Sequence, residues 1–440
     1  METTLLPRLE FAGGRCYSLA VMSGEYRTKA LLIAVSGDPV PAQACINRLI
    51  PEFLCFVVSE SRKASIEADI QPAITTMPQR WDWILVEESD SFTASHQTLT
   101  KSLPDMLKTW GLQPGELVLD FSRATPAIAA AMALAGRPWT SQVVGLTTPE
   151  SDTGKNDVVA VGDRTFAWQE GNLWNEEAVQ ARQEATLLFN QGAFPSAAKR
   201  FRHIESLVGG SLKPLYHALA NLADGYAAWE GFKYRDAWDK LKTALKALEL
   251  ASVWGGPPGM SSLLAGVKQN LKFLESIVMN PDDVKLPVAH DLLAHAKRRG
   301  ERDQQIDSAL QLLLRALEAY AQYHLWKQYG IKSWDVQVEQ LPQDLQEPCR
   351  ACYASDVDGK FHLPLQAQFR ALAGLGHPMG QTFVNEWTKI KILWDAAHQS
   401  VLGHGFQTTK ADRFHQFYAA AVKLTNVTEP NLPAFPKMTL

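Results

Sequence analysis

Short apolar runs recur through the first third of the chain, and each is followed by residues typical of turns. The runs cover residues 29–35, 53–58, 83–86, 117–119 and 143–146, with a further edge strand at 157–161. Continuous apolar runs of this length are typical of strands buried on both faces of a parallel sheet. Three helical segments separate the runs, at residues 41–50, 92–110 and 127–135. The alternation predicts a doubly wound α/β domain of the Rossmann type over residues 1–170.

Polar residues follow the carboxyl ends of three of these predicted strands. They are Ser36, Gly37, Asp38, Ser59, Asp120, Ser122, Arg123 and Thr125. Ligands of a doubly wound sheet bind beyond the strand carboxyl ends, where helix N-termini offer backbone N–H groups to anions. For any single serine or aspartate, turn formation or helix capping is the better explanation. For the whole set, a phosphate or ribose site is an equal alternative, although the G-x-G-x-x-G and P-loop motifs are absent from the sequence.

The later part of the chain has apolar residues at helical spacing. Two similar segments place the aromatic residues Phe194 and Tyr234 at helix starts, forty positions apart. We interpret these segments as two helical hairpins stacked like tetratricopeptide units, too few to form a solenoid. The sequence therefore predicts an all-α region, with a bridging part over residues 171–290 and a second helical domain over 291–440.

Two histidines, His398 and His404, lie six residues apart in this last helical domain. The pattern predicts a helix over residues 383–402, and Gly405 is a residue type that commonly ends a helix in the left-handed conformation. Both histidines should therefore lie close to one helix end, where the helix dipole favours cationic imidazole. Histidine is the residue type whose side chain commonly changes its charge near neutral pH. From the local pattern alone, packed or solvated histidines are the favoured alternative to a site.

A C-x-x-C pair offers a second candidate chemistry. Cys349 and Cys352 could form a zinc site together with His362 and His377. A lone C-x-x-C is weak evidence, so we favour two ordinary cysteines and no metal. The five cysteines are odd in number and widely scattered, which is not the pattern of a disulfide framework. Zincin, nucleophile-elbow and kinase motifs are absent from the sequence.

Composition narrows the class of protein. Hydrophobic residues make up 46% of the 440 residues and charged residues 20%, which is enough to form folded cores. The net charge of −4 argues against a wholly basic protein that coats nucleic acid, though not against a local basic patch. The first residues lack the profile of a signal peptide, and no apolar run approaches the ~20 residues of a membrane span. We therefore expect a cytoplasmic protein with no membrane partner.

Taken together, these motifs resemble a known family. The glycine/serine turn after the first strand, and the D-[FY]-[ST]-x-x-T turn at residues 120–125, resemble the CARF domain of CRISPR-associated proteins. The stretch R-A-L-E-A-Y-A-Q-Y-H-L and the later H-G-F resemble the HEPN ribonuclease domain. The whole chain is similar to the CARF–HEPN accessory ribonucleases of type III CRISPR systems, in particular to the subgroup with an extended helical region between the two domains.

Both family motifs are altered in this chain. The CARF turn commonly reads D-x-T-G-G-T-K, whereas Arg123 and Ala124 here replace the glycines and Pro126 replaces the lysine. The HEPN motif is R-x(4–6)-H, and His398 stands in its arginine position. Arginine clamps phosphate through a permanently charged fork, whereas imidazole is shorter and only partly protonated.

The HEPN resemblance implies a short list of catalytic residues. They are His398, Gln399 and His404. Arg315 and Glu318 lie upstream on the neighbouring HEPN helix, and we interpret them as an ordinary i,i+3 pair on its face. Two histidines could act as an acid–base pair, or the altered site could be weakened or inactive.

The resemblance also implies partners and a reaction. Two chains would form a homodimer whose HEPN groove cleaves single-stranded RNA without a metal, leaving a 2′,3′-cyclic phosphate. A cyclic oligoadenylate would bind the CARF dimer as an allosteric ligand, not as a cofactor. Two alternatives stay open: a cyclic-nucleotide-binding regulator with an inactive HEPN site, and a ring-opening activity on the cyclic ligand that uses Ser36, Ser122 or Arg123.

Overall fold

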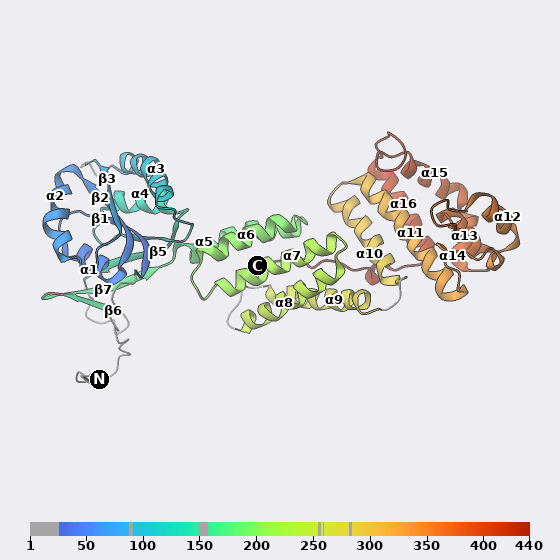
Figure 1. Cartoon of the computed structure of the whole chain (residues 1–440), viewed down its shortest axis with the longest axis horizontal. Coiled ribbons are helices and arrows are strands. Elements are labelled where there is room, and N and C mark those ends of the chain that lie inside the picture. The colour runs from blue at the N-terminus through green and yellow to red at the C-terminus, as the bar shows by residue number, and fades with distance from the viewer. Residues whose placement is uncertain (1–25, 88–90, 149–156, 254–256, 258, 281–283) are drawn as a thin grey trace. The chain divides into compact units, whose positions relative to one another are not determined.

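The computed structural model describes residues 26–87, 91–148, 157–253, 257, 259–280 and 284–440 (Figure 1). The chain forms two compact units, and the division lies between Leu173 and Trp174. Within the described residues, no helix combines the length and the apolar character needed to span a membrane.

The first unit is built on a seven-stranded sheet in the order β3-β2-β1-β4-β5-β7-β6. The strands are β1 (Thr28–Ala34), β2 (Pro51–Ser59), β3 (Arg80–Val86), β4 (Leu117–Asp120), β5 (Thr140–Thr147), β6 (Asp157–Val161) and β7 (Arg164–Gly171). Strands β1 to β5 pair in parallel and confirm the predicted strands, and β6 is the predicted edge strand. The sequence pattern does not predict β7, because its short buried centre around Ala167 lies between polar neighbours. This strand pairs antiparallel with both β5 and β6.

Helices cover both faces of this sheet (Figure 1). They are α1 (Val40–Leu49), the short α2 (Lys63–Ser65), α3 (Phe92–Thr109) and α4 (Pro126–Gly136). Leu31 and Ile33 of β1 belong to the core on the α1 side, whereas Leu32 of the same strand belongs to the core under α3 and α4. Burial on both faces explains why the strands are continuous apolar runs. The predicted doubly wound α/β fold is confirmed.

The second unit begins with a bundle of five described helices. They are α5 (Leu173–Asn190), α6 (Phe194–Leu207), α7 (Lys213–Glu230), α8 (Tyr234–Val253) and α9 (Met260–Val278). The helix starts expected at Phe194 and Tyr234 are confirmed. The buried rings of Tyr226 and Trp229 stack with their centroids 6.2 Å apart, and both contact Phe435 from the end of the chain. An aromatic core therefore holds these hairpins together.

The helices that follow pack around the long helix α11. They are α10 (Leu286–Lys297), α11 (Ile306–Tyr329), α12 (Gln343–Cys352), α13 (Leu365–Gly374), α14 (Pro378–Asn385), α15 (Trp387–His398) and α16 (Ala411–Thr425). A π-helical turn, Arg298–Arg302, lies between α10 and α11. The apolar face expected on α11 is confirmed, since Leu310, Leu313 and Leu317 are all buried. This helix is the framework on which the site described below is built.

The prediction of one helix over residues 383–402 is wrong. The region forms α14 and α15, and α15 ends at His398. Two side chains satisfy one carbonyl group of its last turn: the hydroxyl of Ser400 and the amide of Gln311 both donate to the carbonyl of Ala397, at 2.8 and 2.9 Å. Side-chain hydrogen bonds of this kind compete with the next helical turn, so the helix stops.

The last residues of the chain return from α16 to the α5–α9 bundle (Figure 1). The Asn190 side chain donates to the carbonyl of Met438 and accepts from its N–H, both at 2.8 Å. The Asn270 side chain donates to the carbonyl of Ala434 at 2.9 Å. Since Met438 is also buried, the chain end ties the two halves of the second unit together.

Candidate functional site

The two histidines of the second unit meet although they do not share a helix. His398 is the last residue of α15, and His404 lies in the loop that follows. Their rings stack with centroids 5.5 Å apart and planes inclined by 11°. The backbone N–H of His404 donates to the carbonyl of His398 at 2.6 Å. Both histidines therefore lie close to one helix end, as predicted, but His404 reaches it through a loop.

The two imidazoles have different surroundings. His398 is partly buried, whereas His404 is exposed. Burial lowers the pKa of His398 below its ordinary value, the neighbouring His404 lowers it further, and Asp395 opposes the shift. His398 is therefore mainly a neutral imidazole at pH 7 and is able to accept a proton. Gln399 is the remaining residue of the three that the resemblance implies to be catalytic. It is exposed at the C-cap of α15, where its backbone N–H donates to the carbonyl of Asp395 at 2.9 Å.

Two glycines allow the loop to return so closely to the helix end. A Cβ atom on Gly403 would lie 2.5 Å from the carbonyl oxygen of His398, and one on Gly405 would lie 2.2 Å from that of Gln399. Neither glycine has a positive φ, so the left-handed conformation expected for Gly405 is wrong. Glycine is needed because the backbone approaches itself, and not because of its φ.

Gly405→Ala is expected to lower the free energy of unfolding by about 2 kcal/mol, because the added methyl group forces the loop away from α15. Urea denaturation followed by circular dichroism measures this change. Gly210→Ala is the matched control, since its Cβ meets nothing within 4 Å. It should change stability by less than about 0.5 kcal/mol. Equal effects of the two substitutions would contradict this account of the loop.

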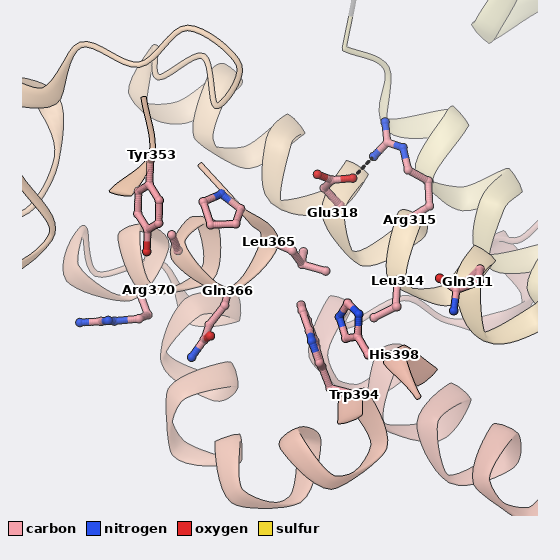
Figure 2. A pocket seen from close by; sticks show the side chains of 12 residues that line it. Gln311, Leu314, Arg315, Glu318, Tyr353, Leu365, Gln366, Arg370, Trp394 and His398 are labelled. Carbon is pink, nitrogen blue, oxygen red and sulfur yellow. Dashed lines mark hydrogen bonds and ion pairs between the residues drawn. The ribbon is translucent and has the colours of Figure 1, made fainter. Parts of the chain in front are cut away.

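A pocket of about 500 Å³ opens beside His398 (Figure 2). Its walls come from α11, from the first half of α13, from α15, and from Tyr353 just after α12. The lining residues include Gln311, Arg315, Glu318, Tyr353, Trp394 and His398. Arg315 donates to Glu318 and to Gln322, both at 3.2 Å, so the expected i,i+3 pair is confirmed. Its position on the wall of this pocket does not follow from the sequence.

In the first unit, residues that follow β1 and β4 come together beyond the carboxyl ends of these strands. Asp38 forms ion pairs with Arg123 at 2.9 Å and with Arg164 at 2.6 Å. Burial raises the pKa of Asp38, but the two guanidinium groups and a backbone hydrogen bond outweigh burial and lower it. The hydroxyl of Ser36 donates to the carbonyl of Arg123, and Gly37 turns the chain with a φ of +87° and open space beside it. Two cations are thus held around one carboxylate.

Asp120 and Ser122 hold the turn after β4 in place. Asp120 is 1% exposed, and its carboxylate accepts from the backbone N–H of Ser122 at 2.7 Å and from its hydroxyl. The same hydroxyl accepts from the N–H of Leu146 at 2.8 Å. Burial raises the pKa of Asp120 to about 6, although the hydrogen bonds from Ser122 oppose this rise. These contacts suit a supporting role behind Arg123.

Two further candidates take local structural roles. The hydroxyl of Ser59, the last residue of β2, lies 3.2 Å from that of Ser61, and Thr125 accepts from the N–H of Ile128 at 3.3 Å as the N-cap of α4. Sequence reasoning missed Arg164, because β7 was not predicted. The Gly162-Asp163 turn between β6 and β7 is the signal that would have found it, since such pairs are typical of tight hairpins.

The C-x-x-C pair lies on α12, where Cys349 is buried and Cys352 is exposed. His362 is 3.0 Å from Asp358, and His377 accepts from a backbone N–H as the N-cap of α14. Within the part of the chain that the structure describes, no three His, Cys, Asp or Glu residues are placed to hold a metal.

Comparisons with known proteins agree with this arrangement. Residues 178–274 match the Csm6 6H domain, and residues 282–428 match the Csm6 HEPN domain. The fold is similar to that of Enterococcus italicus Csm6 bound to cyclic hexa-2′-fluoro-hexa-dAMP, with 13% identity and a TM-score of 0.54, over 92% of this chain and 96% of that chain. The predicted order of an α/β domain, a helical middle region and a HEPN domain is thereby confirmed.

Two other comparisons add no support. One is with the structure of Can2 from Sulfobacillus thermosulfidooxidans in complex with cyclic tetra-adenylate. The match covers 51% of this chain and 69% of the Can2 chain, at 8% sequence identity. Its TM-score of 0.24 is too low to indicate a shared fold. No curated protein sequence matches the chain.

Proposed function

Because this chain belongs to the CARF–HEPN family of type III CRISPR accessory proteins, we propose that it is an endoribonuclease of antiviral defence controlled by a cyclic oligoadenylate. The observation that carries the proposal is the stacked pair of His398 and His404 at the end of α15. RNA cleavage without a metal requires one group to accept a proton and another to donate one. Two adjacent imidazoles in different surroundings suit these two roles.

The surroundings of the two rings support an assignment of roles. His398, whose pKa is lowered, accepts the proton of the ribose 2′-hydroxyl. The 2′-oxygen attacks the phosphorus, and the bond from phosphorus to the 5′-oxygen breaks. His404, whose side chain is exposed, donates a proton to the leaving 5′-oxygen. The products are a 2′,3′-cyclic phosphate and a 5′-hydroxyl. Arg315, which shares the pocket with His398, is a nearby cation that favours binding of the phosphate.

The surface beside the histidines supports a homodimer. Val401, Leu402 and Phe406, which flank His404 in the loop, are 54%, 55% and 97% exposed. Exposed apolar residues that lie together commonly mark an interaction surface. We assign this surface to a second copy of the chain, because a two-fold interface would bring both histidine pairs to one groove. Single-stranded RNA would bind along that groove.

The cation cluster of the first unit supports the binding of a cyclic oligoadenylate. Arg123 and Arg164 share the carboxylate of Asp38, and a phosphate could replace that carboxylate as their partner. The fold is shared with a Csm6 that was solved with a cyclic hexanucleotide analogue. A ligand that binds the active state more tightly would shift the protein toward that state.

The test is cleavage of a fluorescent single-stranded RNA with and without cyclic tetra- and hexa-adenylate. We expect one of the ligands to switch on cleavage. Arg123→Ala should raise the ligand concentration for half-maximal activation about tenfold, because one charged hydrogen-bond partner is lost. Arg80→Ala is the control, since Arg80 begins β3 and so lies at the opposite end of the parallel strands. No cleavage with either ligand, beside tight ligand binding in calorimetry, would overturn the nuclease and leave an inactive receptor.

A further inference from the structure

The pocket beside His398 is lined by aromatic, cationic and carboxylate side chains (Figure 2). We propose that it binds one base of the RNA strand, next to the phosphate that is cleaved, and that it prefers a base with an exocyclic amino group over uracil. This inference rests on the proposed nuclease function, because that function makes RNA the substrate. The volume of about 500 Å³ lies in the range of small-ligand pockets and is adequate for a single base with its sugar.

An aromatic wall joins this pocket to the histidine pair. The ring of Trp394 lies 5.4 Å from that of His398, and His398 in turn stacks on His404. The ring of Trp387 packs edge-on against that of Trp394, with the two centroids 6.1 Å apart, and so supports the Trp394 ring. Figure 2 shows Trp394 and His398 side by side at one edge of the pocket, with Tyr353 on a separate segment. A base placed against Trp394 would therefore be a direct neighbour of the proton-transferring ring.

Two arginines on the lining supply positive charge for the RNA backbone. Arg315 and Arg370 are half exposed, and each is held by one acidic residue: Glu318 at 3.2 Å and Asp344 at 3.3 Å. Guanidinium groups held in this way can bind phosphate while the carboxylate fixes their orientation. Cations beside aromatic rings are the combination by which proteins bind single-stranded nucleic acids.

Glu318 provides the means to distinguish bases. Its Oε2 atom accepts from Arg315, and an ionised carboxylate has further lone pairs on both oxygens. A carboxylate accepts hydrogen bonds and donates none, so it pairs with the amino groups of adenine, cytosine or guanine. Uracil has no amino group; its pairing edge presents two carbonyl oxygens, which the carboxylate repels, on either side of a single ring N–H. Glu318, which lies outside the HEPN motif, would therefore set the base preference of this pocket.

The experiment measures binding and cleavage separately. Binding is measured on the full chain carrying His404→Ala, by fluorescence anisotropy with fluorescein-labelled octamers of adenylate and of uridylate. Trp394→Ala should weaken binding of the adenylate octamer about tenfold, and Trp394→Phe should retain most of the affinity, because an aromatic face remains. Glu318→Gln should lower the preference for adenylate over uridylate about fivefold, because one charged acceptor is lost.

Glu347→Gln is the matched control. Glu347 is also the acid of an i,i+3 pair, with Arg350, but it lies on the exposed surface of α12. If Glu318→Gln and Glu347→Gln keep the same preference, or if Trp394→Ala binds adenylate as the parent does, the base site is overturned. The rate of cleavage of the same two octamers is measured with the chain in which His404 is intact. Absent cleavage would overturn the nuclease function alone, whereas normal cleavage with unchanged binding would overturn the base site alone.

Discussion

His404→Ala is expected to lower the rate of RNA cleavage by about 10³-fold, because general acid–base catalysis by one side chain contributes roughly 10²–10⁴-fold. His404 is exposed and stacks on His398, so its removal opens no cavity in the core. Ligand binding in the first unit should be unchanged, since that site shares no residue with the loop. The rate should be measured in single turnover with saturating cyclic oligoadenylate, so that release of product does not hide the chemical step.

The control for this substitution is His415→Ala. His415 is an exposed histidine of α16 whose ring contacts Phe414 and not the histidine pair. The His415→Ala variant should therefore cleave RNA at the same rate as the parent protein. Parental activity in His404→Ala would show that the stacked pair is not the catalytic centre. Equal losses in both substitutions would point to a general loss of structure.

Glu230→Gln is expected to lower the free energy of unfolding by about 3 kcal/mol at pH 7. Glu230 ends α7, is only 10% exposed, and lies 3.0 Å from His295 and 2.8 Å from Arg298. Arg299 and Arg302 lie within 3.6 Å of the same carboxylate. Removing the acid leaves the three arginines with only Asp291 and Asp303 as acidic partners inside a mostly buried cluster, which costs more than the loss of one surface pair.

The pH dependence follows from the pKa of Glu230. Burial raises that pKa, but the hydrogen bond from His295 and the charge of Arg298 outweigh burial and lower it from 4.5 to about 2. A carboxyl group whose pKa is lower in the folded state stabilises the fold above the unfolded pKa, and this contribution is lost as pH falls. The difference between the parent and Glu230→Gln should therefore be complete at pH 7 and shrink between pH 4.5 and 2.

Urea titrations at pH 7 and pH 4 measure both effects. Glu249→Gln is the control, because Glu249 forms an exposed ion pair with Lys268 at 2.8 Å. Exposed pairs of this kind contribute less than about 1 kcal/mol. If Glu230→Gln costs no more than Glu249→Gln at pH 7, the buried ion cluster is not a main source of stability. The result bears on the site as well, since the π-helical turn of this cluster leads directly into α11.

The parallel core of the first unit could be predicted from the sequence, because a strand covered on both faces is apolar at nearly every position. Residues 29–35 and 53–58 show this plainly, and both became central strands. Helix starts at Phe194 and Tyr234 could also be predicted, since each combines a turn with an apolar stripe at helical spacing. These features depend on neighbours within a few residues, and local sequence carries that information.

The candidate site could be predicted only in part. His398 and His404 stand out by spacing, but their stacking depends on Gly403 and Gly405 and on the carbonyl groups that these glycines approach. The end of α15 depends on Gln311, which lies 86 positions before the carbonyl that it caps. A periodicity argument cannot detect a hydrogen bond between residues so far apart.

The sequence by itself determined the layers, the helical middle region and the two candidate histidines. Tertiary structure alone decided which polar groups from distant parts of the chain meet. Arg164 joins Asp38 across 126 positions, and Glu318 faces the same pocket as Trp394 because α11 packs against α15. The physical reason is that apolar burial follows a short repeat along the chain, whereas charged and hydrogen-bonding groups find their partners only after distant segments have packed.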